Sequence, residues 1–579
     1  MLTACHESAA QNAPITEERS GRPFPTDRMR CIDGKTATII CFVAATAATA
    51  VLISLFDGSL IAADSAQAFS VVRNTLAGHP LQTDLIIYSE HYRQGGPLVA
   101  QTVFPPGFPL LLLLPVTMGM SAKTAAFAWG AFSFWLIPQL IYRLGIRAAL
   151  PPVAALAAGL SWMGFAANWA NALMCLTDLT FIAVTLVSVL ALCPDPRNNP
   201  PRQAGSSRLI AGGILASLAF LIRYAGVFWL PAAAFLIVHQ TRSDLRLTVR
   251  RLLLFSAIPT AVVIGCFARN HQLVGSIEGG NNQKVAKPVI EVVRTVWYAV
   301  SQTLGLDHDA MLAGRLQEVL VVAGAAVLLT LVSWTVLRSG TRKNIPGGLA
   351  DQNVMEAMAL WAVSMTAGLL WLEKSASLSM TGRMLQPLIP SALLILAAIA
   401  VRIQIPSRVS LSVVSAATGV LGVGLMTAQL QIFQHALGPG LVFLQVTRAV
   451  NQAVETPEAK SLTARELLQG QRILAEQSQS LGEVLQQGTV GLTPFRYSRQ
   501  AWSEAEVSDM VRRYRITRLV RFPKIIELPR SANPVFFEQL AEGQPLPAWL
   551  SVEVSTPDVV IYRVEPNSLP PIHIAEGTR

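Results

Sequence analysis

Long apolar segments recur along most of this chain, and they constrain its fold more than any other feature. Of its 579 residues, 52% are hydrophobic and only 14% are charged, whereas soluble domains carry about 25% charged residues. The apolar runs are mostly about 20 residues long, which is the length an α-helix needs to cross a bilayer. The sequence therefore predicts an α-helical polytopic membrane protein.

The basic residues orient these segments, because short cytoplasmic loops collect Lys and Arg. Whether the short segment that follows Pro105 and Pro106 crosses the membrane determines on which side each later loop lies. If it lies at the outer surface without crossing, the later basic clusters all fall inside; if it crosses, they move outside. We therefore expect an interfacial helix over 105–120 and about eleven transmembrane helices, at 36–56, 124–142, 149–168, 174–193, 209–222, 225–240, 252–269, 317–337, 354–372, 384–401 and 409–432.

This topology divides the chain into three parts. Residues 1–35 form a cytoplasmic tail, residues 36–434 a transmembrane domain with a first outer loop at 57–121, and residues 435–579 an extracytoplasmic C-terminal domain. Runs rich in Thr, Val, Ile and Tyr at 515–522 and 549–564 predict strands, and 459–487 predicts helices. We expect this α/β domain to act as a lid or docking module, since its sequence holds no nucleophile motif and no glycine-rich phosphate loop.

Composition also excludes some functions. The net charge of +10 does not indicate nucleic-acid binding, because much of the basic excess lies in short predicted loops and no basic run is interleaved with aromatic residues. The six cysteines form no CxxC pair, which argues against a disulfide framework or a zinc site.

Two acidic residues stand at the predicted outer ends of spans. Asp64 follows the first span closely, and Asp178 opens a later one. Charges at the mouth of a membrane are costly, so each is a candidate for function. Two carboxylates at one cavity can supply a general base together with a metal ligand or an orienting group. The alternative is that each caps a helix N-terminus, where Asp is favoured.

Three arginines are predicted on the same outer face, namely Arg223, Arg269 and Arg383. A guanidinium binds phosphate through paired hydrogen bonds, and Asn270 beside Arg269 adds a further donor. The alternative is that these residues are plain helix ends whose long side chains reach the interface. The sequence leaves both interpretations open.

Candidate metal ligands are weaker. Glu90 and His91 in the first loop are residue types that bind metals, but nothing fixes their geometry, and a solvated loop face is the simpler interpretation. The sequence Asp307-His308-Asp309 has the spacing of a metal site and is likewise more often solvated surface.

The order of these residues resembles the GT-C superfamily of polyprenyl-phosphate-sugar-dependent glycosyltransferases, over about residues 36–400. The bacterial lipopolysaccharide-core galacturonosyltransferase group is the nearest in pattern, with the protein O-mannosyltransferases and the lipid A aminoarabinose transferase as relatives. The matching elements, in chain order, are Asp64-Ser65 with Phe69 and Gly78 (the first-loop acid motif), Phe104-Pro105-Pro106-Gly107-Phe108-Pro109 (YPPGYP), Thr177-Asp178 (the second outer acid), Arg223-Tyr224-Ala225-Gly226 (RYAG), Arg269-Asn270 with Gly275 (RNxxxxG), and Gly382-Arg383 with Pro387 and Pro390 (RYLLPLLP).

The resemblance implies an inverting hexosyl- or pentosyltransferase in the bacterial plasma membrane, with its active site facing outward. The donor would be a polyprenyl-phosphate sugar, and the acceptor a hydroxyl of a cell-envelope glycan, lipid or protein. No nucleotide or organic cofactor is implied. Asp64 would act as general base and Asp178 would orient the acceptor or help bind a metal, while Arg223, Arg269 and Arg383 would neutralise the leaving phosphate. The other expected substrate-binding residues are Tyr224, Asn270, Pro105 and Pro106.

Departures and rivals remain. Phe104 stands where many relatives carry a charged residue, which leaves a divalent metal cofactor open, with Glu90 as another source of a ligand. A transporter or flippase of lipid-linked precursors is the main rival function, but it needs charges along a path through the bilayer. A non-catalytic assembly protein would tolerate loss of Asp64. The clustering of charges on one predicted face favours an enzyme.

Overall fold

The computed structural model describes four stretches of the chain. They are residues 33–193 apart from 59, 60 and 88; residues 205–304 apart from 242, 243, 278 and 280–287; residues 350–402 apart from 376–381; and residues 442–570 apart from 456–462, 493–502, 524–535, 537–539 and 541–544. Residues 1–32 of the predicted tail, the predicted spans at 317–337 and 409–432, and residues 307–309 lie outside the described residues.

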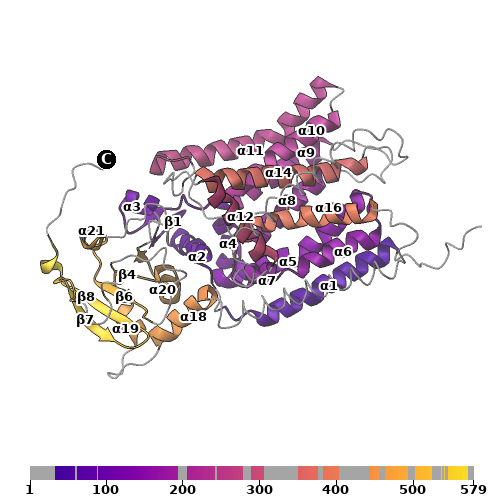
Figure 1. The fold of residues 1–579 in the computed structure, drawn as a ribbon. Helices are drawn as coiled ribbons and strands as arrows, with labels where there is room; N and C mark the ends of the chain where they lie inside the picture. Colours follow the sequence, from indigo (N-terminus) through magenta and orange to yellow (C-terminus); the bar gives the residue numbers. More distant parts are fainter. Residues whose placement is uncertain are drawn as a thin grey trace, which may run out of the picture.

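Helices that lie side by side form the larger part of the molecule, and a sheet lies at one end of them (Figure 1). The bundle consists of α1 (Gly34–Leu55), α5 (Ala122–Arg147), α6 (Pro152–Met163), α7 (Ala166–Leu173), α8 (Asp178–Leu192), α9 (Ser206–Ile222), η1 (Tyr224–Phe228), α10 (Trp229–Thr241), α11 (Leu245–Val274), α12 (Val289–Leu304), α14 (Ala350–Ser375), α15 (Gly382–Leu385), η2 (Gln386–Leu388) and α16 (Ile389–Arg402).

Five of the described helices are long and apolar enough to cross a membrane. They are Gly34–Leu55, Ala122–Arg147, Tyr224–Thr241, Leu245–Val274 and Val354–Leu372, and the bent pair α6–α7 makes a sixth if it is one span. Both α8 and α9 are apolar but shorter, with 15 and 17 residues. The chain thus has several membrane-type helices, and the total of eleven stays a prediction.

Polar residues at helix ends set several of these boundaries. The side chains of Asp33, Ser121 and Asp244 accept hydrogen bonds from backbone N–H groups in the first turns of α1, α5 and α11, which satisfies donors that a helix start leaves free. Gly275 ends α11 in the left-handed conformation, with φ +70°. With 30 residues, α11 is roughly 45 Å long, well beyond the predicted span.

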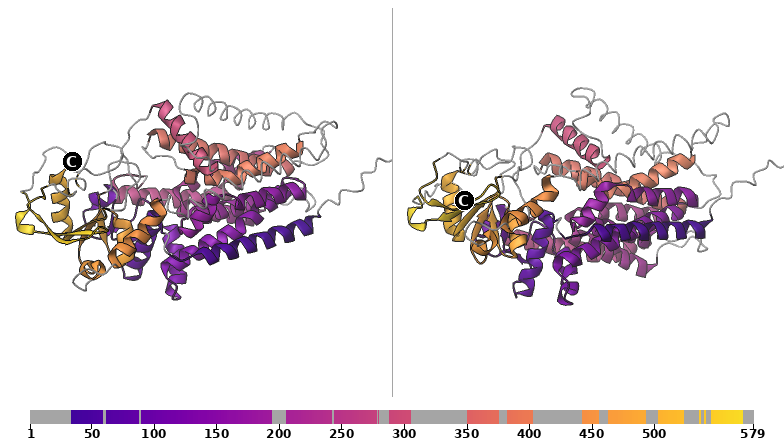
Figure 2. Two further views of the ribbon diagram at one scale, coloured as in Figure 1. Left: turned by 60° about the horizontal axis from the view of Figure 1, so that its bottom comes forward. Right: turned by 90° about the horizontal axis from the view of Figure 1, so that it is seen from below.

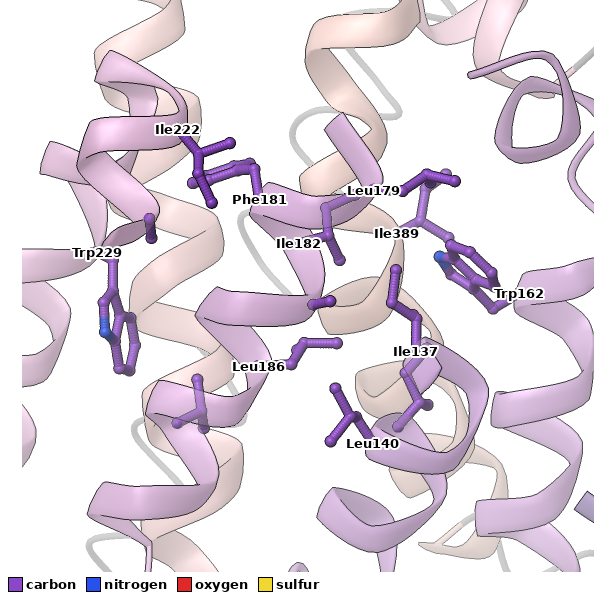
Figure 3. Packing of buried hydrophobic residues seen from close by; sticks show 14 of the residues in the cluster. Ile137, Leu140, Trp162, Leu179, Phe181, Ile182, Leu186, Ile222, Trp229 and Ile389 are labelled. Carbon is purple, nitrogen blue, oxygen red and sulfur yellow. The ribbon is translucent and has the colours of Figure 1, made fainter. Parts of the chain in front are cut away.

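The apolar core runs between the helices, with α8 at its centre. Leu179, Ile182 and Leu186 of α8 face Ile137 and Leu140 of α5 (Figure 3). On another side of α8, Phe181 lies beside Ile222 at the end of α9 (Figure 3). Because α8 is packed on several sides, the position of Asp178 at its N-terminus is fixed.

The first loop is folded. It contains α2 (Ala63–Leu76), β1 (Gln82–Thr83), β2 (Leu85–Ile86), α3 (Ser89–Gln94), β3 (Val99–Ala100) and α4 (Gly107–Thr117). With 11 residues, α4 is roughly 16 Å long, about half the thickness of a hydrocarbon core. A helix of that length is too short to cross the hydrocarbon core alone, and its position at the membrane surface stays a prediction.

A six-stranded sheet joins the first loop to the C-terminal region. Its order is β2-β5-β4-β6-β8-β7, in which β2 pairs in parallel with β5. The five strands from the C-terminal region are β4 (Ile473–Ala475), β5 (Thr489–Gly491), β6 (Arg518–Arg521), β7 (Leu550–Ser555) and β8 (Val560–Val564). The last three fall inside the segments predicted as strands, whereas β2 was not expected to belong to this sheet.

Helices cover both faces of the sheet. On one face, α21 (Glu504–Tyr514) packs together with Ile86 and Tyr92 of the first loop. On the other face lie α18 (Val442–Glu455), α19 (Ala464–Leu468) and α20 (Ser478–Leu485). These orange and yellow segments gather at the end of the bundle in both further views (Figure 2).

Candidate active site

Asp64 lies in the first turn of α2, and its carboxylate contacts an arginine from a distant part of the chain. Its Oδ2 lies 2.5 Å from Nη2 of Arg383 in α15. Both side chains keep access to solvent, with 26% of Asp64 and 28% of Arg383 exposed. The pair is therefore reachable by a substrate.

Asp178 lies in the first turn of α8 and is almost completely buried, with 1% of its side chain exposed. Its Oδ2 lies 2.8 Å from Nη1 of Arg223, which follows α9, and 3.7 Å from Nε of Arg383. Arg223 also donates to Oγ1 of Thr177 at 3.2 Å. Arg383 thus lies between the two acids, and we call Asp64, Asp178, Arg223 and Arg383 the acid–arginine cluster.

The turn before α8 brings the two acids together. Ser65, beside Asp64, donates through Oγ to the carbonyl oxygens of Met174 and Cys175 at 2.8 and 3.1 Å. The Ala62 N–H donates to the Met174 oxygen as well, at 3.4 Å. These contacts fix the start of α2 against the segment that leads into Asp178.

Both acids lie in the first turn of a helix, where the helix dipole favours a negative charge, but their side chains do not cap it. The N-cap residues of α2 and α8 are Ala62 and Thr177, so neither acid stands at the cap position. A buried carboxylate is costly unless it is paired, and Arg223 and Arg383 pair with Asp178. Within the described residues, however, neither Asp178 oxygen accepts a well-aligned hydrogen bond. The cluster therefore carries two negative and two positive charges, and the Asp178 oxygens can still accept hydrogen bonds.

Tyr224, Arg269 and Asn270 form a second group that contacts the end of the first loop. Tyr224 Oη donates to the Thr102 oxygen at 2.9 Å, and Asn270 Nδ2 donates to Tyr224 Oη at 3.0 Å. Arg269 Nη1 donates to the Gln101 oxygen at 3.0 Å. These side chains hold backbone oxygens, so Arg269 differs from Arg223 and Arg383, whose partners are acids.

Pro105 and Pro106 lead directly into α4, beside the cluster. A Cβ added to Gly107 would lie 2.6 Å from the carbonyl carbon and oxygen of Leu221. Only glycine therefore lets the start of α4 approach the end of α9 so closely. This contact lies two residues before Arg223, which gives the glycine of the Pro-Pro-Gly element a packing role.

His91 is buried in the first loop and away from solvent. Its Nδ1 accepts from the Ile87 N–H at 3.4 Å, and its Nε2 lies 3.4 Å from Gln101 Oε1. Burial lowers the pKa of His91 to about 4, so the ring is neutral at pH 7. The side chain of Glu90 lies outside the described residues.

The described residues do not fit a divalent metal. Nowhere in the described ranges do three or more His, Cys, Asp or Glu side chains gather as ligands would. In the acid–arginine cluster, Arg383 holds the position between the two carboxylates, and its positive charge would repel a cation. Residues 307–309 lie outside the described part of the chain.

Sequence reasoning found the four charged residues but missed the contacts around them. It did not assign Ser65 to the Met174–Cys175 turn, nor the close fit of Gly107 on Leu221. It also missed the buried contact between the amides of Asn171 and Gln386. Gln386 follows Arg383 by three residues, and a polar residue inside an apolar segment was the available signal.

No family model matches this sequence, and no curated protein matches it either. Solved structures do match. ArnT from Cupriavidus metallidurans bound to undecaprenyl phosphate superposes with a TM-score of 0.53 at 13% identity, covering 93% of this chain and 99% of that one. The described chain has a GT-C-like fold.

Two further structures extend the comparison. ArnT from the same organism in the apo state gives a TM-score of 0.51 at 14% identity, over 93% of this chain and 100% of ArnT. The oligosaccharyltransferase of Archaeoglobus fulgidus, in complex with Zn and sulfate, gives 0.49 at 12% identity, over 92% of this chain and 74% of that one. At such identities the likeness to the two ArnT structures shows the fold alone, and function must be argued from the site.

Proposed function

We propose that this protein is an inverting membrane glycosyltransferase that moves a hexosyl or pentosyl group from a polyprenyl phosphate to an acceptor hydroxyl. The acid–arginine cluster carries the proposal. It joins a solvent-accessible carboxylate to two arginines at the end of an apolar helix bundle. The carboxylate can take the proton of an acceptor hydroxyl, and the two arginines can bind the phosphate of a lipid donor. The fold of ArnT, a protein solved with undecaprenyl phosphate bound, supports this assignment.

Asp64 acts as the general base. It takes the proton of the acceptor hydroxyl while the oxygen attacks the anomeric carbon from the side opposite the phosphate. The bond from that carbon to the phosphate oxygen breaks, and the polyprenyl phosphate leaves with the bonding electrons. One bond forms and one breaks on opposite faces, so the sugar inverts. No residue of the chain becomes covalently linked to the sugar.

The arginines stabilise the charge that develops on the phosphate. A sugar phosphodiester carries one negative charge and its product carries more, so positive donors at the leaving oxygen lower the barrier. Arg383 is placed for this role, because it contacts Asp64 and is partly exposed. When the donor binds, its phosphate replaces Asp64 as the partner of Arg383, which frees Asp64 to accept a proton.

Asp178 orients Arg223 and Arg383. Its burial excludes it from direct contact with bulk solvent, and its two arginine neighbours lie at 2.8 and 3.7 Å. Arg269, Tyr224 and Asn270 act less directly, by holding the end of the first loop next to the cluster. Pro105 and Pro106 set the start of α4 beside it.

The topology belongs to the same proposal. The cluster, the first loop and the C-terminal α/β domain face the outside of a bacterial plasma membrane, about eleven helices cross it, and the acceptor is an envelope glycan, lipid or protein. Two features support this placement: the alternation of basic loops in the sequence, and the sheet that joins the first loop to the C-terminal region.

Sugar transfer from a labelled donor tests the proposal. The purified full-length protein is supplied with lipid extracts that carry a labelled polyprenyl-phosphate sugar, and transfer is followed for wild type and Asp64→Asn. Loss of a general base lowers such rates by about 10²–10⁴-fold. Asp244→Asn, at the cap of α11, is the matched control, because Asn also caps helices.

Equal transfer by wild type and Asp64→Asn would remove Asp64 from the mechanism. No transfer with any donor, together with movement of a lipid-linked precursor between leaflets, would favour the flippase alternative instead.

A further inference from the structure

An open groove runs along the N-terminal part of α11 beside the start of α9, at the far ends of these helices from the acid–arginine cluster. Its volume is about 790 Å³, and it is lined by Ile210 of α9 and by Leu245, Arg246, Val249, Arg250, Leu253, Leu254, Ala257 and Ile258 of α11. α11 carries Arg269 and Asn270 near its other end. Because 23 residues separate Arg246 from Arg269, the arginine end of the groove lies roughly 35 Å from that end of the helix.

The lining residues are ordered as in a site for an amphiphile. Arg246 and Arg250 stand one turn apart on the same face of α11, and both are exposed. Beyond them along the helix come the aliphatic residues Leu253, Leu254 and Ile258, of which Leu253 is 62% exposed. From Arg250 to Ile258 the helix rises roughly 12 Å, close to one half of the hydrocarbon core of about 30 Å.

The charged end of the groove is strongly positive. Asp244 is the nearest acid in sequence, and its side chain caps α11 by accepting from the Leu247 N–H. Within the described ranges, neither Arg246 nor Arg250 makes an ion pair. The Cβ atoms of two residues one turn apart on a helix lie about 5–6 Å from each other. At this spacing the guanidinium groups of Arg246 and Arg250 can both donate to one phosphate.

The walls fit an acyl chain better than a partner helix. Interfaces between transmembrane helices are rich in small residues that let backbones approach closely. Here the exposed wall consists of Leu245, Val249, Leu253 and Ile258, and Ala257 is the small residue among them. Large branched side chains in a hollow suit the flexible chain of a lipid.

We propose that this groove binds an anionic glycerophospholipid of the leaflet opposite the acid–arginine cluster. Arg246 and Arg250 hold its phosphate, and an acyl chain lies along Leu253 to Ile258. The site is separate from the donor site and does not depend on the proposed transfer reaction. Its ligand is a structural lipid that lies along the exposed face of α11, beside Ile210 of α9.

Native mass spectrometry of the full-length protein tests this site. The protein is taken from nanodiscs of phosphatidylcholine alone or of phosphatidylcholine mixed equally with phosphatidylglycerol, and the retained lipids are counted. Each basic residue near an anionic lipid surface contributes about 1 kcal/mol, and 1.4 kcal/mol is a factor of ten. The double variant Arg246→Gln/Arg250→Gln should therefore retain phosphatidylglycerol about 30-fold less well.

Two further variants control the experiment. Lys35→Gln/Arg143→Gln removes the same charge from exposed positions outside the groove and should retain lipid as wild type does. Ala257→Trp fills the groove without changing charge and should also lower retention, with its thermal unfolding in phosphatidylcholine unchanged.

Equal losses in the two double variants would overturn the proposal, since general charge would then explain them. Equal retention of phosphatidylcholine and phosphatidylglycerol would overturn the proposal too. So would a preference for added undecaprenyl phosphate over phosphatidylglycerol, which would assign the groove to the donor lipid.

Discussion

Two acids of the first loop, Asp64 and Asp84, each pair with an arginine and have similar exposure, yet their surroundings differ. Asp84 accepts two hydrogen bonds from Arg73, at 2.8 and 2.9 Å, and one from Ser70 at 2.6 Å. Its arginine stands only 11 residues away, on α2. Asp64 meets Arg383, 319 residues away.

The difference separates a structural ion pair from the one that we propose to be reactive. Asp84 has local partners that satisfy both of its oxygens, so it fastens α2 to the strand that follows. Asp64 has one strong contact and a partner that also lies near a second acid, Asp178. A carboxylate held in this way can exchange its partner when a phosphate arrives. Residue type and exposure alone would not distinguish the two.

The largest effect is expected at Arg383. Replacing it with Gln removes the positive charge between the two acids and should lower transfer by about 10²–10³-fold, the usual cost of losing a donor that stabilises developing charge. Arg383→Lys keeps the charge but loses the planar fork, so it should recover part of the rate. Transfer rates at saturating donor measure both. Full activity in Arg383→Gln would place the phosphate elsewhere.

Asp84→Asn should show the opposite pattern. Loss of a hydrogen-bonded charge that is mostly buried should destabilise the protein by about 1–2 kcal/mol, while the folded fraction transfers sugar at the wild-type rate. Thermal unfolding in detergent and transfer per folded molecule measure the two quantities. Arg73→Gln is the matched control, and the double variant should cost little more than either single one. A catalytic defect without destabilisation would make the two acids alike.

A smaller effect concerns pH. The pKa of His91 is lowered from 6.5 to about 4 in the folded protein, so the unfolded chain binds the proton more readily. The contribution of neutral His91 to stability is present above pH 6.5 and is lost as the pH falls toward 4. Melting temperature should therefore fall over this range more steeply in wild type than in His91→Gln.

Glu483 changes the stability with pH in the opposite direction, and it is present in both wild type and His91→Gln. Its burial raises its pKa, so its protonated form is favoured in the folded state and this group gains stability as the pH falls. If the melting temperatures of wild type and His91→Gln fall in parallel between pH 6.5 and 4, the lowered pKa of His91 is contradicted.

Sequence patterns predicted the parts of this molecule that depend on local rules. Apolar length located the helices, and the two acids and two of the three arginines at their predicted outer ends meet in the cluster. Asp64 and Arg383 were each predicted from their charge at the end of a span, but no local rule predicts their contact across 319 residues. The strand β2 was missed because it has only two residues, Leu85 and Ile86, and its pairing partner lies in the C-terminal region.

The pairing of β2 with β5 bears on how the protein is made. Tyr92, just after β2, donates through its hydroxyl to the Gly491 oxygen, 399 residues later in the chain. During synthesis the first loop therefore waits, with an unpaired strand edge, until nearly the whole protein has left the ribosome. Such an edge is prone to wrong pairing. A chain that stops before β5 would hold Asp64 and Arg383 without the sheet that joins the first loop to the C-terminal region, so the proposed site is complete only after β5 has been made.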